Sequence, residues 1–425
     1  MVSGFFYGVN MNTTITIKDY PCGSGKTTSM INSFKEEEKY LVILPYLKEV
    51  DRVILETNNV TFVQPTPTET ISNTKSESLR DFLLLGKNIA TTHSMYERLV
   101  PLTQEGLLED YNIIIDEVPE VVQSVSSKSK TSIKDFYIDG GYIEVTANGL
   151  VTATDKWRQK REEVADTLST NILTYAETGC LYLLGEQMFI WAMPSKLLQS
   201  GKSVTIMTFK VEGSMLTSYL NKLSIPFIVK RDKQKEEAFR EQAAELINLQ
   251  DIPNISKLKL SHSGQQHGVR SREYCSKLSG SLKNLRGRQL KGLDLSNVLL
   301  TCKKDAWVKE NGKAGVFAQG SKMFENTNWI ANTTRGTNEY AHCSHLIYLY
   351  DQHVNPVVAR WLNEHTRSFD DAYALTELIQ WVWRSRIRKG EPITLYLPAP
   401  RMRSIFIDWL EGWDNHQIGM FSLAD

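Results

Sequence analysis

The chain has 425 residues, of which 41% are hydrophobic and 23% are charged, a composition typical of a soluble globular protein with two or three domains. Lys and Arg number 49 and Asp and Glu also number 49, which excludes a uniformly basic, histone-like protein but allows a local basic surface. No apolar run approaches the roughly 18 residues that span a bilayer, and residues 1–12 do not resemble a signal peptide. The five scattered cysteines favour a reducing, cytoplasmic location.

The first part of the chain alternates short apolar runs with amphipathic stretches. Strands are expected at 14–19, 40–45, 61–64, 88–92 and 112–116, and helices at 27–39, 47–56, 78–85 and 95–100. Strands that are apolar on both faces are typical of a buried parallel sheet. Their alternation with helices predicts an α/β fold.

A second set of α and β signals follows a charged run at 230–241. Residues 124–132 are expected to form a loop and 155–177 a helix. Strands are expected at 180–184, 188–193, 203–208, 257–261, 297–302, 329–333, 346–350 and 393–398, and helices at 356–364, 371–387 and 404–409. The chain is therefore predicted to form two α/β domains, residues 1–228 and 229–425, with little room for accessory domains.

A glycine-rich segment at 20–28 (YPCGSGKTT) follows a predicted strand and opens a predicted helix. Glycines let successive backbone N–H groups turn toward phosphates, and a helix N-terminus adds partial positive charge. Lys26 is expected to reach the β- and γ-phosphates, and the Thr27 hydroxyl to bind Mg²⁺. Tyr20 replaces the first glycine of the strict motif, so a glycine-rich turn with a chance lysine is the alternative.

Two carboxylates follow the apolar run at 113–115 (III), at the end of a predicted buried strand. Ligands of parallel α/β sheets bind at that edge. Asp116 is expected to hold Mg²⁺ through water, and Glu117 to orient and deprotonate an attacking water molecule. Solvated acids at a strand end are the alternative, but the Lys26 loop upstream favours a site that hydrolyses a nucleotide.

These two motifs, in this order, resemble motifs I and II of superfamily 2 helicases, whose core is two RecA-like domains with ATP in the cleft. Residues 116–119 (DEVP) stand at the DExx box in a form that is neither DEAD nor DEAH. The resemblance implies two tandem RecA-like P-loop domains with parallel sheets, and ATP and Mg²⁺ as cofactors. It implies nucleotide contacts from Pro21, Cys22, Gly23, Ser24, Gly25, Lys26, Thr27, Thr28 and Gly336, and metal contacts from Thr27 and Asp116.

Weaker similarities to other helicase motifs extend over most of the chain. Residues 41–53 resemble motif Ia, 90–99 the next backbone-contact motif, 205–216 motif III with Thr208 as its key residue, and 333–340 motif V. This resemblance implies nucleic-acid contacts from Pro45, Thr92, His93 and Thr333.

Residues 378–389 (LIQWVWRSRIRK) resemble motif VI, which supplies arginine fingers to the γ-phosphate. Gln380 and Arg384 fit the family spacing, whereas position 387, where the second arginine is usual, is Ile. Arg388 lies one helical turn beyond Arg384 and is expected to share its face. The resemblance thus implies a catalytic set of Lys26, Glu117, Gln380, Arg384 and Arg388. The two tryptophans nearby are interpreted as packing residues.

The segment 257–291 contains nine Lys or Arg residues and one acid, for a net charge of +8. A solvated basic face is the ordinary interpretation of such a run. Its position early in the second domain favours contacts with a phosphate backbone. The candidate nucleic-acid contacts in this run are Arg270, Arg272, Lys283, Arg286 and Arg288.

The sequence therefore indicates an ATP hydrolase of the helicase or translocase type, acting on nucleic acid, with DNA favoured over RNA. Replication, recombination or repair is the expected context, with proteins of those processes as further candidate partners and no membrane. Compact motors of this kind resemble those of phages and mobile elements, which would place the protein in a host cytoplasm. The alternatives are an RNA helicase, an origin- or junction-binding protein switched by ATP without unwinding, and a P-loop small-molecule kinase.

Overall fold

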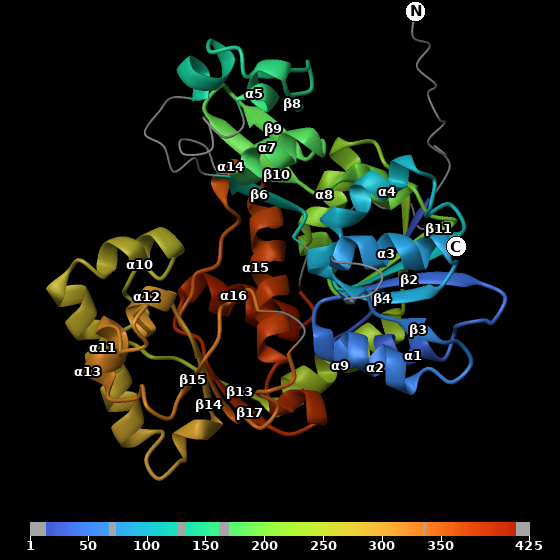
Figure 1. Cartoon of the computed structure of the whole chain (residues 1–425). Coiled ribbons are helices and arrows are strands. Elements are labelled where there is room, and N and C mark those ends of the chain that lie inside the picture. The colour runs from blue at the N-terminus through green and yellow to red at the C-terminus, as the bar shows by residue number, and fades with distance from the viewer. Residues whose placement is uncertain are drawn as a thin grey trace, which may run out of the picture.

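Two parallel sheets organise the protein (Figure 1). The computed structural model describes residues 14–67, 74–118, 120–125, 133–160, 170–334 and 337–413. The first sheet has seven strands in the order β12-β1-β11-β5-β2-β4-β3, and the second has five in the order β13-β17-β16-β14-β15. All strand pairs in both sheets are parallel. The predicted α/β class with parallel sheets is confirmed.

The first sheet is built around two strongly apolar strands, β2 and β5, which pair with each other at its centre. Its strands are β1 (Ile15–Asp19), β2 (Lys39–Leu44), β3 (Phe62–Val63), β4 (Asn88–Thr92), β5 (Tyr111–Asp116), β11 (Ser203–Thr208) and β12 (Phe227–Arg231). The helices of this domain are α1 (Lys26–Ile31), α2 (Leu47–Glu56), α3 (Lys75–Leu84), α4 (Val100–Gln104) and α8 (Met215–Lys222). Burial on both faces of β2 is what its apolar sequence predicts.

The second sheet begins after α9 (Lys233–Leu246), the helix through which the chain leaves the first domain. Its strands are β13 (Ile247–Gln250), β14 (Val298–Thr301), β15 (Asn328–Trp329), β16 (His345–Tyr348) and β17 (Ile393–Tyr396). The helices are α10 (His262–Gly268), α11 (Arg272–Arg288), α12 (Lys304–Trp307), α13 (Val316–Ser321), α14 (Pro356–Leu362), α15 (Arg367–Val382) and α16 (Pro400–Leu410). The division at residues 228 and 229 stays a prediction.

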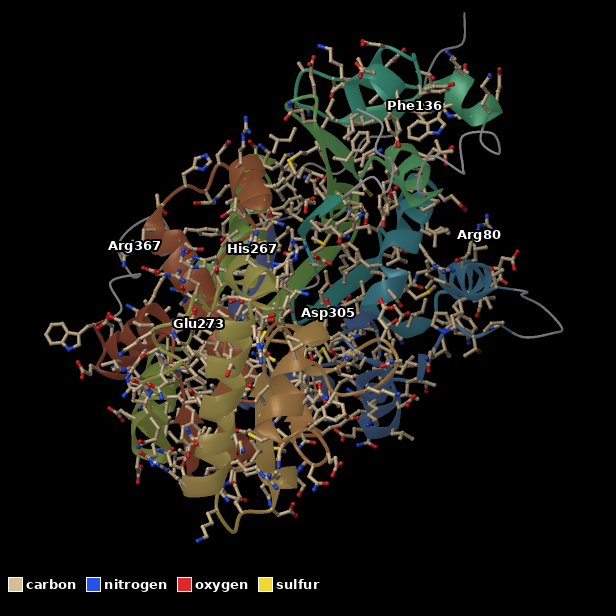
Figure 2. All side chains as sticks on the ribbon, turned by 90° about the vertical axis from the view of Figure 1, so that its left-hand side faces the viewer. Arg80, Phe136, His267, Glu273, Asp305 and Arg367 are labelled. Carbon is tan, nitrogen blue, oxygen red and sulfur yellow. The ribbon has the colours of Figure 1, made fainter. Side chains whose placement is uncertain are left out.

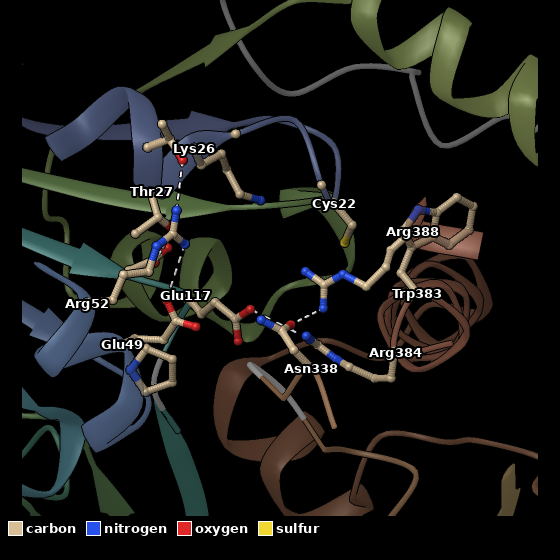
Figure 3. A pocket seen from close by; sticks show the side chains of 15 residues that line it. Cys22, Lys26, Thr27, Glu49, Arg52, Glu117, Asn338, Trp383, Arg384 and Arg388 are labelled. Carbon is tan, nitrogen blue, oxygen red and sulfur yellow. Dashed lines mark hydrogen bonds and ion pairs between the residues drawn. The ribbon is translucent and has the colours of Figure 1, made fainter. Parts of the chain in front are cut away.

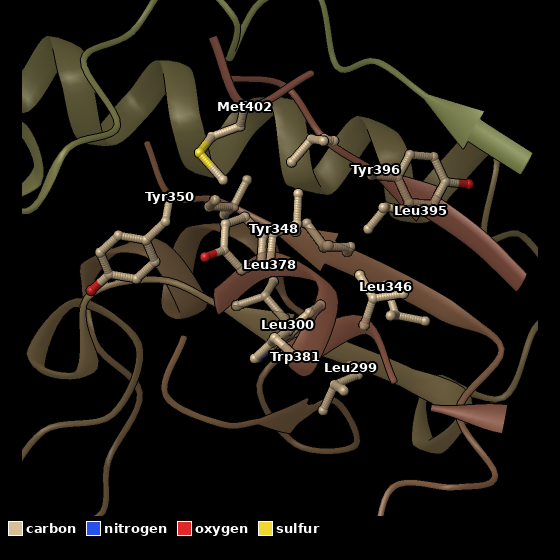
Figure 4. Close-up of a cluster of buried hydrophobic side chains, with 14 of the residues drawn as sticks. Leu299, Leu300, Leu346, Tyr348, Tyr350, Leu378, Trp381, Leu395, Tyr396 and Met402 are labelled. Carbon is tan, nitrogen blue, oxygen red and sulfur yellow. The ribbon is translucent and has the colours of Figure 1, made fainter. Parts of the chain in front are cut away.

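The core of the second domain packs α15 against the sheet (Figure 4). The Trp381 ring meets Tyr348 edge-on, with ring centroids 5.2 Å apart, and both side chains are fully buried. Trp383 packs on Phe239 of α9, with centroids 4.2 Å apart. Both tryptophans are therefore packing residues, and Trp383 ties α9 to the end of α15.

A small accessory module is inserted between β5 and β11. Its elements are the antiparallel sheet β6 (Val122–Val125), β10 (Met188–Ala192) and β9 (Leu181–Leu184), the hairpin β7 (Ile143–Val145) and β8 (Val151–Ala153), and the helices α5 (Asp155–Gln159) and α7 (Thr170–Glu177). It has its own buried cluster around Tyr137, Trp157 and Phe189. The expectation of a near-minimal core is wrong, because the strands expected near 180 and 190 pair antiparallel outside both parallel sheets.

Several predicted elements differ from the structure. The helix expected at 27–39 ends at Ile31, because the chain turns there and buries Phe34. Residues 257–261 follow a turn and have an irregular, bent backbone rather than a strand. Of the helix expected at 155–177, the described parts are α5 and α7. The helix expected at 95–100 is replaced mainly by two short 3₁₀-helices, His93–Met95 and Glu97–Leu99. Further short helices lie at Lys134–Ile138, Ser195–Gln199, Val211–Gly213, Leu295–Asn297 and Arg386–Lys389.

The second domain contacts the first domain and the module through different helices. On α15, Thr376 Oγ1 donates to the Lys210 carbonyl at 3.3 Å. A Cβ on Gly213 would lie 2.2 Å from the Ala372 carbonyl oxygen, so the approach requires glycine. On α14, the Trp361 ring lies 5.1 Å from that of Tyr182 in the module. In the part of the chain described, no helix is long and apolar enough to cross a membrane.

Candidate active site

The loop between β1 and α1 has the backbone of a phosphate-binding loop. Gly23 and Gly25 both have φ +77°, in the left-handed region, and neither has a heavy atom within 4 Å of where a Cβ would stand. Backbone conformation, not crowding, therefore requires glycine here. Lys26 Nζ donates to the carbonyl oxygens of Tyr20 at 2.9 Å and Thr208 at 3.1 Å, which places the ammonium group beside the loop.

Thr27 and Asp116 meet at the carboxyl edge of the first sheet. Thr27 Oγ1 donates to Asp116 Oδ2 at 2.8 Å. Burial, together with neighbouring Glu117, raises the pKa of Asp116 to about 6. A hydroxyl and a carboxylate so close together are oxygen ligands of the kind that Mg²⁺ prefers. These two residues therefore fit the metal that the sequence implies.

Glu117 follows Asp116 in a backbone conformation that is uncommon for a residue other than glycine, with φ 60°. Its N–H donates to the Met207 carbonyl at 2.9 Å, which fixes the turn. Glu117 Oε1 lies 3.6 Å from Arg384 Nη2 of the second domain. Glu117 Oε2 and Arg384 Nε are buried without a hydrogen-bond partner among the residues described. Most buried polar atoms in proteins are hydrogen-bonded, so these two atoms are suited to contact a ligand bound between the domains.

One cavity collects these groups from both domains (Figure 3). The first domain lines it with Cys22, Gly23, Gly25, Lys26, Thr27, Thr28, Pro45, Glu49, Arg52, Asp116 and Glu117, and the second with Asn338, Trp383, Arg384 and Arg388. Of the predicted cofactor residues, Pro21 and Ser24 lie in the loop but do not line the cavity. Gly336 and Pro119 lie outside the described residues.

The two arginines reach the cavity by a different path from the one expected. Helix α15 ends at Val382, not at 387, because the chain turns tightly at Ser385, whose hydroxyl donates to the Val382 carbonyl at 2.7 Å. Arg384 lies in this turn and Arg388 in the following 3₁₀-helix. The prediction that Arg384 and Arg388 share one face of a helix is therefore wrong, although both side chains line the cavity.

Arg388 and Gln380 have different surroundings. Arg388 donates to the Asn338 side chain and, at 3.5 Å, to the Thr337 carbonyl. Burial, with a contribution from nearby Arg384, lowers the pKa of Arg388. Gln380 is buried in α15 and does not line the cavity. The structure thus does not bring Gln380 together with the other members of the predicted catalytic set.

Four cavity residues were not predicted as part of the site: Glu49, Arg52, Asn338 and Trp383, the last of which was interpreted only as a packing residue. Arg52 Nη2 donates to Thr28 Oγ1 at 2.9 Å, and Arg52 Nη1 lies 3.5 Å from Glu49 Oε2. The three-residue spacing of Glu49 and Arg52 places them on one face of a helix. That spacing alone does not show that the face is turned toward the phosphate loop.

A groove runs between the domains beside the cavity. We use "interdomain groove" for a hollow of about 880 Å³ lined by Pro45, Tyr46, Leu47, Lys48, Glu49, Lys75, Thr92, Ser94, Ile330, Thr334, Thr337, Asn338, Glu339 and Tyr340. A smaller neighbouring hollow is lined in part by Pro45, Tyr46, His93, Glu117 and Thr333. His93 Nε2 is hydrogen-bonded to the Asp116 carbonyl at 3.0 Å. The predicted nucleic-acid contacts Pro45, Thr92, His93 and Thr333 are therefore brought together.

The basic run is not part of these hollows. Its candidate residues Arg270, Arg272, Lys283, Arg286 and Arg288 are all exposed and line none of the three hollows. Four of them belong to α11, which faces the viewer in Figure 2 and lies on the side of the second domain away from the first. The structure thus separates two surfaces that the sequence assigned to one ligand.

Comparison with known proteins gives a relative and a fold. A family model described as the YonV C-terminal Rossmann-like domain matches residues 241–410. The chain is 27% identical over 414 residues to the SPbeta prophage-derived protein YonV of Bacillus subtilis (strain 168), covering 93% of this chain and 98% of that protein. The solved structure of apo XPD is similar with a TM-score of 0.52 and 12% identity, covering 96% of this chain and 97% of that one. This likeness confirms the predicted fold of two tandem RecA-like domains with parallel sheets.

Proposed function

We propose that the protein is an ATP-dependent helicase or translocase that acts on DNA. The observation that carries this proposal is the cavity between the two domains. Arg384 and Arg388 of the second domain face the Lys26 loop and the two carboxylates of the first domain there. A site that needs groups from two domains is complete only when the domains approach each other, as a nucleotide-driven motor requires.

Five cavity residues have roles that follow from their positions. Lys26 and the N–H groups of its loop bind the phosphates, while Thr27 and Asp116 would hold Mg²⁺. When bound, Mg²⁺ supplies charge neutralisation at the phosphate oxygens. Glu117 orients the attacking water and accepts its proton, and Arg384, 3.6 Å from Glu117, stabilises the charge that develops on the transferred phosphoryl group.

The cavity and the groove share residues, which gives hydrolysis a route to the nucleic acid. Pro45 lines the cavity and both neighbouring hollows, and Glu117 lines the cavity and the smaller hollow. His93 binds the carbonyl of Asp116 and borders the same hollow. A change at the carboxylates therefore alters the surface that holds the strand.

DNA is proposed as the polymer because residues 116–119 (DEVP) do not match the DEAD or DEAH forms of the main RNA helicase branch. The prophage origin of the relative supports a role in phage replication, recombination or repair. An RNA helicase and a non-unwinding ATP switch are the competing functions, and the choice of stimulating polymer separates them.

Replacing the loop lysine tests the site. Lys26→Ala is expected to abolish ATP hydrolysis, because it removes the cation nearest the phosphates. Steady-state phosphate release is the measurement. Lys35→Ala, an exposed lysine outside the cavity, is the matched control. Full turnover by Lys26→Ala would show that hydrolysis takes place elsewhere.

A further inference from the structure

The interdomain groove contains large apolar side chains that a surface made only for phosphates would not need. Tyr46 is 42% exposed and Leu47 is 51% exposed, at the entry to α2. Ile330 and Tyr340 line the same groove from the second domain. Apolar surface gathered in a groove marks a contact site for a ligand with apolar faces.

Two lysines, two acids (Glu49 and Glu339) and several hydroxyl groups accompany these apolar side chains. Lys48 and Lys75 are exposed, and Thr92 and Thr334 are among the hydroxyl-bearing residues of the groove. Lys48 Nζ lies 3.1 Å from Glu339 Oε1 of the second domain, so this pair spans the two domains. Apolar or aromatic groups beside cations are the combination that binds a single strand, whose base faces stack while its phosphates meet positive charge.

An intact duplex fits this groove less well, because its base faces are hidden and only phosphates and groove edges are accessible. The volume of about 880 Å³ lies within the range of small-ligand sites. The groove also shares Pro45, Glu49 and Asn338 with the nucleotide cavity. A strand held here would therefore lie directly beside the site of hydrolysis.

Tyr46 has the position best suited to a base contact. It lines both the interdomain groove and the smaller hollow. It is the N-cap of α2, in extended conformation with φ −140° and ψ 155°, and its side chain makes no capping hydrogen bond. Tyr46 is 42% exposed, so a ligand in the groove can reach this residue.

We propose that Tyr46 stacks on an unpaired nucleobase and that the interdomain groove thereby selects single-stranded nucleic acid. This inference rests on the proposed function and adds a base-contacting residue to it. Contacts to the phosphate backbone alone would hold a strand whether or not its bases were present. Removing the bases therefore distinguishes base stacking from backbone binding.

The experiment measures binding of an oligothymidylate and of an abasic strand with the same number of phosphates, by fluorescence anisotropy. Wild-type protein is expected to bind the oligothymidylate roughly tenfold more tightly than the abasic strand. Tyr46→Ala is expected to lose that preference, and Tyr46→Phe to keep it because the ring remains. Leu55→Ala serves as control, because it also truncates a large exposed side chain to alanine, at a residue that is 79% exposed and lies outside the groove. Oligouridylate in a parallel arm distinguishes RNA from DNA.

Equal wild-type affinity for the base-bearing and abasic strands overturns the inference, as does a preference that survives in Tyr46→Ala. Tighter binding of duplex than of single strand also contradicts it. In those cases the protein still binds nucleic acid, so the proposed function stands. Absence of any binding by the wild type removes the proposed function and the inference together. Thermal unfolding of Tyr46→Ala, followed by circular dichroism, verifies that the variant folds.

Discussion

Arg384 enters the cavity from the turn after α15, and its guanidinium lies 3.6 Å from the Glu117 carboxylate. Arg384→Ala should leave ATP binding nearly unchanged but slow turnover at least ~10³-fold, because the charge of the transition state loses its partner. Nucleotide binding and single-turnover hydrolysis separate the two effects. Arg386→Ala is the control, since Arg386 Nε donates to the Pro392 carbonyl at 2.6 Å and does not line the cavity. Unchanged turnover in Arg384→Ala would mean that motif VI is misassigned.

His353 gives the stability of the second domain a dependence on pH. Hydrogen bonds to Asp351 and Asp370 raise the pKa of His353 to about 9, against burial and Arg401, which lower it. Because the folded pKa is raised, this stabilisation is fully present below the unfolded value near 6.5 and is lost as the pH rises through about 9. The His353 side chain is 43% exposed, so the contribution is only about 1 kcal/mol.

His353→Gln is accordingly expected to lower the free energy of unfolding at pH 6 and to match the wild type at pH 10. Urea unfolding at a series of pH values is the measurement. His267→Gln is the control, because His267 bonds the Ser263 carbonyl rather than a carboxylate. A His353→Gln deficit that stays constant from pH 6 to pH 10 would contradict the assignment.

Site residues were predictable where the chemistry is local in the sequence. The Lys26 loop and the pair Asp116 and Glu117 could be found because glycines, lysine and carboxylates adjoin expected strands. Asn338 could not, because it meets Arg388 only through two loops that precede different strands, β16 and β17. Gln380 matched a family spacing, but burial in α15 keeps it from the cavity.

Among the helices, α11 is the one whose predicted role, binding a phosphate backbone, stays a prediction. Its exposed cations stand opposite a buried face formed by Leu278, Leu282 and Leu285. Reversal of three cations to Glu, at Lys283, Arg286 and Arg288, should weaken nucleic-acid binding and reduce the slope of log K against log salt by up to about 3.

Binding is measured over a range of salt concentrations. The matched control reverses three exposed lysines of the first domain, Lys35, Lys87 and Lys230, and changes the net charge equally. If the α11 variant keeps the wild-type slope, α11 is a solvated face and the interdomain groove alone binds the strand.

Helices and strands were predicted accurately where local sequence determines them, and poorly where contacts between distant residues do. Strand β5 was predicted within one residue, because a short, almost entirely apolar run is itself the signal of a buried strand. Residues 257–261 (KLKLS) alternate like a strand, yet their irregular backbone brings Leu258 and Leu260 onto the core. The turn that ends α15 is followed by a long-range contact, in which the Arg386 N–H donates to the Cys343 carbonyl at 3.1 Å. Neither contact leaves a local signal.

For the whole molecule, the proposed function depends on the cavity between the two RecA-like domains. The alternation of strands and helices predicted both parallel sheets. It did not predict the accessory module, because short antiparallel strands look like those of a parallel sheet until their partners are known. Helix α14 packs on this module and α15 packs at Gly213, so the domains contact each other well beyond α9. The proposed movement of the cavity walls would have to preserve or break these contacts.

We propose that ATP hydrolysis in the cavity drives movement along a nucleic-acid strand. The most direct measurement is steady-state ATP hydrolysis without polymer and with single-stranded DNA, duplex DNA or RNA, in the wild type and in Glu117→Gln. We expect stimulation by single-stranded DNA that is lost in Glu117→Gln, because Glu117 is the proposed activator of the attacking water. Wild-type hydrolysis at the same rate with all three polymers and without them would show a nucleotide hydrolase that is not a motor.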